Sequence, residues 1–133
     1  GLLLAAGLLF GLTASAVTGT KVNSLATLKS MASTGGECYL NCKGDVLTEK
    51  ITIPAGKVLT LDLNGFNVGA PHADYAFDVS GTLVIKNTDG SYSSSIGRSS
   101  AFQSDASLKP LFRVNNGGVL TINPGTGKVT IKG

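Results

Sequence analysis

The sequence predicts an all-β protein, a short right-handed parallel β-helix of about three to four coils with an N-terminal capping helix and an apolar N-terminal segment. Three observations predict it. From residue 37 onward apolar and polar residues alternate, turn residues separate these short runs, and one three-strand unit occurs repeatedly in the same order. The 133 residues fit one domain. We expect an apolar segment at 1–16, a linker at 17–23 and the β-helix domain at 24–133.

The repeated unit is strand, turn, strand, turn, strand. Its copies begin ITIPAGKVLTLDLNG at Ile51, FDVSGTLVIKNTDG at Phe77 and FRVNNGGVLTINPGTG at Phe112. Strands that stack on their own equivalents account for such a repeat, whereas an antiparallel hairpin protein does not require one. Aligned on the glycine before each second strand, the copies group residues of similar size: Gly56, Gly81 and Gly118; Ile53, Val79 and Val114; Leu59, Leu83 and Leu120; Leu61, Ile85 and Ile122.

One short helix is expected at residues 24–34. Asn23 or Ser24 can cap its first turn, and the apolar residues that follow have helical spacing. Gly35 and Gly36 then end the helix. We expect it to cover the N-terminal end of the coils, where a strand edge would otherwise be exposed.

The first 16 residues, GLLLAAGLLFGLTASA, contain no charged residue and end in the small-residue pattern Ala14-Ser15-Ala16. This pattern is typical of a secretory signal cut between Ala16 and Val17. The alternative is a retained segment, either a membrane anchor or an apolar element buried between subunits, although a span needs about 20 residues. Both predict a secreted protein or one on a cell or virion surface. If the segment is retained for assembly, its contact residues are Leu2, Leu3, Leu4, Leu8, Leu9 and Phe10.

The two cysteines, Cys38 and Cys42, leave several interpretations open. On one strand their Cα atoms would lie about 13 Å apart, whereas a disulfide needs less than about 7 Å. They could therefore pair only if the chain turns around Asn41, or each could pair with another molecule. The alternative is that both are small core side chains. With no further ligand nearby in the sequence, they predict no zinc site.

Charged residues make up only 14% of the chain, and the net charge of +3 is scattered, without a Lys/Arg run. A nucleic-acid-binding protein would gather its basic residues on one face. We therefore expect no nucleic-acid partner. Low charge together with 18 glycines suits an extracellular β structure with many turns.

Three stretches carry a resemblance to a known group. SLATLKSMASTGGECYL, from Ser24, resembles the capping helix and first strand of right-handed parallel β-helix repeat domains of secreted and surface proteins. ITIPAGKVLTLDLNGFNV resembles their first full coil, and GGVLTINPGTGKVTIKG a later one. The pectate-lyase-like superfamily shares this fold. The resemblance covers residues 24–133, is most specific in PAGKVLTLDLNG, and implies a fold more than a function.

Enzymes of that superfamily use clustered acidic residues, which bind Ca²⁺ or act as acid and base beside an arginine or lysine. The repeat alignment predicts no such cluster here. Asp62 aligns with Lys86, and Asp78 aligns with Arg113, so we expect outward-facing charge stacks of small energetic weight. His72, the only histidine, has no neighbouring group to orient it. We therefore predict no catalytic residue, no metal site and no cofactor.

The stretch at 90–110 is the most individual part of the chain. Its residues Tyr92, Arg98 and Phe102 could form a binding surface for a partner or a sugar, because long loops often carry function. The alternative is a packed surface loop.

The function expected from these features is that of a non-enzymatic extracellular structural subunit or surface module, in a filament, sheath, appendage or virion fibre. Such a subunit would self-associate into a homopolymer or join a larger extracellular assembly. One alternative is a carbohydrate-binding or carbohydrate-cleaving β-helix domain, with polysaccharide as its partner. Another is an adhesin fragment that binds through residues 90–110. A membrane partner is expected only if residues 1–16 are retained as an anchor.

Overall fold

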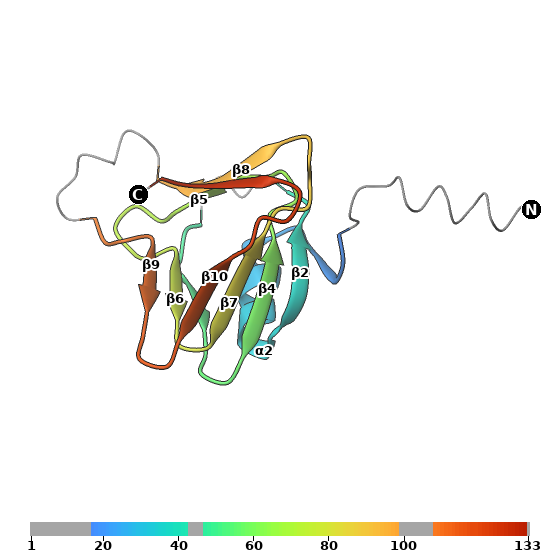
Figure 1. The fold of residues 1–133 in the computed structure, drawn as a ribbon. Coiled ribbons are helices and arrows are strands. Elements are labelled where there is room, and N and C mark those ends of the chain that lie inside the picture. The colour runs from blue at the N-terminus through green and yellow to red at the C-terminus, as the bar shows by residue number, and fades with distance from the viewer. Residues whose placement is uncertain (1–16, 43–46, 99–107, 133) are drawn as a thin grey trace, which may run out of the picture.

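A computed structural model describes residues 17–42, 47–98 and 108–132 (Figure 1). One helix and a series of short strands follow one another along the chain. Their bounds are β1 (Thr20–Val22), α2 (Leu25–Thr34), β2 (Gly36–Leu40), β3 (Ile51–Ile53), β4 (Val58–Asp62), β5 (Val68–Gly69), β6 (Phe77–Val79), β7 (Thr82–Lys86), β8 (Ser93–Gly97), β9 (Phe112–Val114), β10 (Val119–Ile122) and β11 (Lys128–Lys132).

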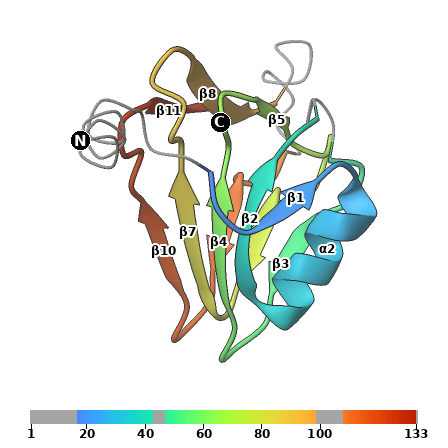
Figure 2. The ribbon, with the colours of Figure 1, turned by 90° about the vertical axis from the view of Figure 1, so that its right-hand side faces the viewer.

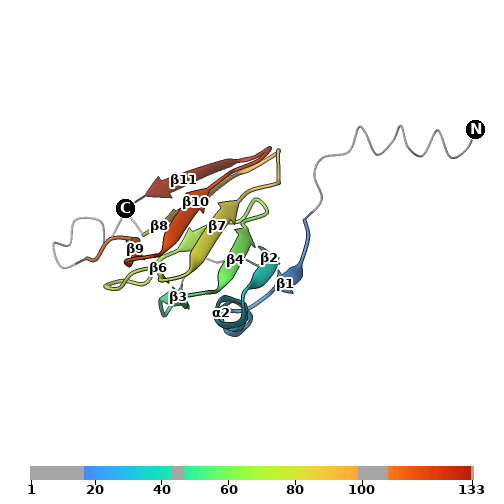
Figure 3. The ribbon, with the colours of Figure 1, turned by 60° about the horizontal axis from the view of Figure 1, so that its bottom comes forward.

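The strands form three parallel sheets, which the chain visits in turn. The first sheet has the order β1-β2-β4-β7-β10, the second β11-β8-β5 and the third β3-β6-β9. Figure 3 shows the strands of each sheet lying as successive layers, with β1 and α2 at one end and β9, β10 and β11 at the other. Each repeat of the sequence therefore contributes one strand to every sheet.

The register of the sheets confirms the repeat alignment of the strands. Equivalent residues lie directly beside one another, at the strand spacing of about 4.8 Å. The paired columns are Ile53, Val79 and Val114; Leu59, Leu83 and Leu120; Leu61, Ile85 and Ile122; and, in the second sheet, Val68, Ile96 and Ile131.

The predicted helix is confirmed as α2. The Ser24 hydroxyl caps it by accepting a hydrogen bond from the backbone N–H of Thr27 at 3.2 Å, and Gly35 ends it with a φ of 79°. Leu28 and Ala32 face the core and are almost fully buried. Figure 2 shows α2 beside β3, at the edge of the third sheet. No helix within the described residues is long and apolar enough to cross a bilayer.

The predicted fold class, an all-β closed parallel β-helix, is wrong. The described residues combine three separate parallel sheets with one α-helix, in a mixed α/β-like arrangement that does not close. Strands β1 and β2 have no counterparts in the other two sheets, and α2 packs next to β3 instead. The physical reason is that each strand pairs only with strands of its own sheet, so backbone hydrogen bonds do not join one sheet to the next. In addition, β1 lies within the predicted linker at 17–23.

Two of the three aligned glycines lie at a corner, before the second strand of the repeat, that is too crowded for a side chain. A Cβ atom on Gly81 would lie 2.3 Å from the carbonyl oxygens of Pro54 and Lys57, so no side chain fits there. A Cβ atom on Gly118 would lie 2.3 Å from the carbonyl oxygen of Val79. Gly56 does not share this role, because the strand register places Lys57 at the level of Gly81. Its requirement is conformational, with a φ of 80°.

Two equivalent residues of the first sheet differ sharply in burial, so their mutation should affect stability differently. Ile85 is fully buried, whereas Ile122, its partner on the edge strand β10, is 39% exposed. Ile85→Ala should lower the free energy of unfolding by about 3 kcal/mol and Ile122→Ala by about 1 kcal/mol, because a cavity forms only where the side chain is enclosed. Urea titration followed by circular dichroism measures both. Equal losses would contradict the placement of β10 at the edge.

Candidate functional site

The open end formed by β9, β10 and β11 is the first candidate site. Each of these strands is the last of its sheet, so each presents a backbone edge with no neighbouring strand among the described residues. Their core-facing residues Val114, Ile122 and Ile131 are 44%, 39% and 40% exposed. Their partners one layer inward, Val79, Ile85 and Ile96, are 0% exposed. Among the described residues, no further layer covers these core-type side chains.

The opposite end differs because other elements cover it. Strand β1 pairs with β2 along the first sheet, and α2 lies against β3 of the third. Phe112 illustrates the contrast between the two ends. Its ring stacks on the ring of Phe77, with 5.6 Å between the centroids. Beyond β9, which contains Phe112, the described residues supply no further strand. Exposed strand edges with an apolar interior pair readily with other strands. Among the described residues, the open end thus combines strand edges without a neighbour and partly exposed apolar side chains.

A polar network covers the outer face of the third sheet. The carboxylate of Asp78 accepts hydrogen bonds from Arg113, at 2.5 and 3.0 Å, and from the side-chain amide of Asn115 at 2.8 Å. Lys50 lies 3.6 Å away, and the Tyr75 ring lies under the Arg113 guanidinium at 4.6 Å. This confirms that Asp78 and Arg113 pair in register, but Asp78 is only 6% exposed, so the expectation of an exposed pair is wrong. A carboxylate held by so many donors acts as a structural anchor.

The second predicted charge stack is wrong. Asp62 and Lys86 do pair in register, but Asp62 is only 2% exposed, and none of the ion pairs among the described residues joins the two. Its oxygens accept hydrogen bonds from the hydroxyl and backbone N–H of Thr88 and from the backbone N–H of Asn64. The turns that follow β4 and β7 supply these donors. Strand alignment alone therefore could not show that these turns bury Asp62.

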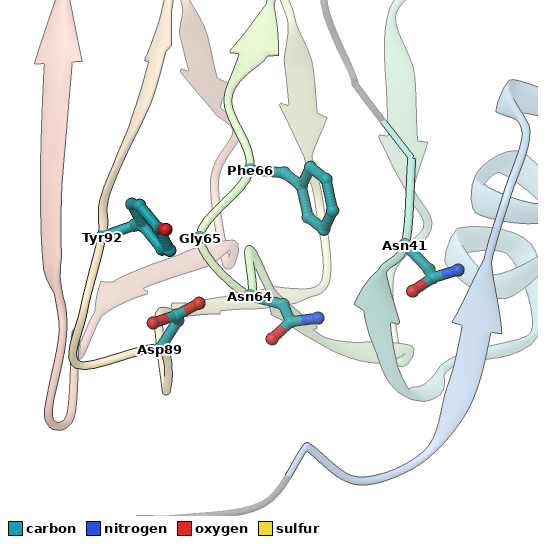
Figure 4. A pocket seen from close by; sticks show the side chains of 6 residues that line it. All are labelled: Asn41, Asn64, Gly65, Phe66, Asp89 and Tyr92. Atoms are coloured by element: carbon teal, nitrogen blue, oxygen red, sulfur yellow. The ribbon is translucent and has the colours of Figure 1, made fainter.

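The second candidate site lies at the corner where the chain leaves the first sheet for the second. A hollow of about 400 Å³ opens there, and Figure 4 shows its lining. We call it the corner pocket, and its residues are Asn41, Asn64, Gly65, Phe66, Asp89 and Tyr92.

Buried Asn87 fixes the shape of this corner. Its side-chain oxygen accepts from the backbone N–H of Gly65 at 2.9 Å, and its nitrogen donates to the carbonyls of Tyr92 and Lys128, both at 2.9 Å. One amide thus joins three successive layers. The turn at Gly65 has a φ of 80°, and a Cβ atom there would lie 2.8 Å from an oxygen of Asp89. The carboxylate of Asp89 is therefore held closely against a residue that must be glycine.

The structure describes two of the three predicted loop residues, and of these only Tyr92 is exposed. Tyr92 is 68% exposed and lines the corner pocket. Arg98 is buried and donates hydrogen bonds to the carbonyl oxygens of Pro71 and Asp74, which is a structural role. Phe102 lies outside the described residues. The remaining pocket residues were missed, although the turn pairs Asn64-Gly65 and Asp89-Gly90 mark the corner in the sequence.

Both cysteines are free thiols. Cys38 lies in the core, where burial, with a smaller contribution from Glu37, raises its pKa to about 12. The Cys42 sulfur lies 3.6 Å from the carbonyl oxygen of Val22. The predicted assembly residues Leu2, Leu3, Leu4, Leu8, Leu9 and Phe10 lie outside the described residues.

Comparisons of the chain with protein-family models, with curated proteins and with solved structures find no match. None of them identifies the pectate-lyase-like superfamily. Within residues 17–42, 47–98 and 108–132, no group of three or more histidine, cysteine or acidic side chains is arranged to hold a metal ion.

The Asp78 network makes stability depend on pH. Hydrogen bonding from Arg113 outweighs burial, and with help from Asn115 lowers the pKa of Asp78 from 3.8 to about 2. Because the folded value lies below the unfolded one, the ionised carboxylate stabilises the fold above pH 3.8, and this contribution is lost as the pH falls toward 2. Arg113 is partly exposed, so the loss should be about 1 kcal/mol.

Urea unfolding of the native chain and of Asp78→Asn, at neutral and acidic pH, measures this contribution. The native chain should lose about 1 kcal/mol more than the variant on acidification. Glu37→Gln, which removes an exposed carboxylate, serves as the control and should behave as the native chain. An identical pH dependence in all three proteins would contradict the assignment.

Proposed function

We propose that this protein is a non-enzymatic structural subunit of an extracellular assembly and that copies of it associate through the open end. The observation that carries the proposal is the exposure of Val114, Ile122 and Ile131, whose equivalents in the preceding layer are completely buried. Association would bury these side chains, as their equivalents in the preceding layer are already buried. Burial of apolar surface contributes roughly 25 cal/mol per Å².

The backbone of the same strands supports the proposal. A free parallel edge leaves alternate N–H and C=O groups without strand partners, and another edge can satisfy them. Strand β10, Val119–Ile122, has no charged residue that would oppose such pairing. Strand β11 carries Lys128 and Lys132, whose repulsion favours a contact centred on β10. An extracellular location is part of the proposal and rests on the signal-like sequence of residues 1–16.

Self-association should respond to a single charge at the open end. We expect the native chain to form dimers or larger species with rising concentration, and Ile122→Lys to remain monomeric, because burial of an unpaired ammonium group opposes contact. Sedimentation velocity measures the species. Circular dichroism should show that the variant stays folded, since Ile122 is already 39% exposed.

Val58→Lys is the matched control. Val58 is 52% exposed and is the first residue of β4. In the first sheet, β4 lies between β2 and β7, and β7 separates it from the edge strand β10. This variant should associate like the native chain. A native chain that is monomeric at every concentration, or equal association of Ile122→Lys and the native chain, would overturn the proposal.

A further inference from the structure

The corner pocket is rich in hydrogen-bond acceptors. The side-chain nitrogen of Asn64 donates to the carbonyl oxygen of Leu40 at 3.1 Å, and that of Asn41 donates to the side-chain oxygen of Asn23 at 3.3 Å. These bonds fix both carboxamides, and Figure 4 shows their oxygens turned toward the side on which Asp89 lies. Neither oxygen accepts a hydrogen bond from any described residue. Two fixed acceptors are therefore available to a ligand.

The fold already uses most backbone N–H groups of the lining. Those of Asn41 and Phe66 donate to carbonyl oxygens of the backbone. Those of Asn64, Gly65 and Asp89 donate to side-chain oxygens. The pocket therefore offers few of the backbone donors that an anionic ligand or a hydroxyl-rich sugar would need.

The charged group of the pocket is the carboxylate of Asp89. One of its oxygens accepts from the backbone N–H of Ser91 at 2.8 Å, whereas the other accepts no hydrogen bond from a described residue. Asp89 forms no ion pair within the described part of the chain, and no basic residue lines the pocket. The pocket thus holds one uncompensated negative charge.

Two aromatic side chains complete the lining. Tyr92 is 68% exposed, and Phe66 is partly buried against the core. Figure 4 shows the rings on either side of the turn at Gly65. An exposed aromatic ring attracts a cation through its negative face. Fixed acceptors, a free carboxylate and an exposed aromatic ring all favour the same kind of ligand.

We propose that the corner pocket binds an organic cation, the alkylammonium or guanidinium group of a ligand, with Asp89 as counter-ion and Tyr92 as the aromatic contact. Such a group has several donors and no acceptor, which matches the lining. A hollow of about 400 Å³ is large enough for the end of a lysine or arginine side chain or for a small polyamine. A sugar would leave its hydroxyl acceptors unpaired, and Ca²⁺ would want more than one carboxylate.

Binding can be measured by NMR titration of the ¹⁵N-labelled chain. The probes are Nα-acetyl-lysine methylamide, its uncharged norleucine analogue, spermidine, glucose and CaCl₂. The lysine probe and spermidine should shift the amide signals of Gly65 and Tyr92 saturably, and the norleucine analogue should not. Tighter binding of spermidine would indicate a free polyamine as ligand, and tighter binding of the lysine probe would indicate a side chain of a partner protein. Binding should weaken as salt is added.

Two variants test the named residues. Asp89→Asn keeps the oxygen that accepts from Ser91 and should weaken binding about tenfold through loss of charge. Tyr92→Leu should weaken it about threefold. Glu37→Gln removes a carboxylate outside the pocket and should bind as the native chain does. Saturation by glucose or Ca²⁺ alone, equal shifts with the lysine and norleucine probes, no shift with any probe, or unchanged affinity in Asp89→Asn would overturn the proposal.

Discussion

The structure depends on parallel pairing in register, in which each strand lies beside its own equivalent from the neighbouring repeat. This constraint makes the columns of aligned residues similar in size, because each side chain packs on its counterpart. It also excludes a side chain at Gly81, where the preceding layer passes too closely. The ion pair of Asp78 and Arg113 follows from the same register, which places the two residues side by side on the outer face.

Strand pairing joins the layers within each sheet, but at the corners between sheets side chains join them. Asn87 does this at the corner between the first and second sheets, where its amide bonds to groups of three layers and is wholly buried. A buried amide is stable only when its partners are fixed. The same hydrogen bonds hold the turn at Gly65 and the backbone at Tyr92. The shape of the corner pocket therefore depends on the interactions that join the layers.

The sequence could reveal the strand columns and the helix, because both depend on local spacing and on a repeat that is visible in the letters. It could not reveal that the three sheets stay separate, because this depends on how segments distant in the chain pack together. Nor could it predict the burial of Asp62, which depends on the turn at Thr88 rather than on strand alternation. The corner pocket was missed for the same reason, since Asn41, Asn64 and Asp89 meet only after the layers have stacked. Tyr92 was predicted as a binding residue because it lies in a long polar stretch, and long loops often carry function.

The open end and the corner pocket are formed by different residues. The open end belongs to the last strand of each sheet, whereas the pocket spans the turns after β2, β4 and β7, along the side of the stack. A contact between copies centred on β10 would bury Ile122 without touching Asn64 or Asp89, since neither residue belongs to an edge strand. Association and cation binding can therefore act together, and each associated copy would still present its carboxylate and aromatic rings to a ligand.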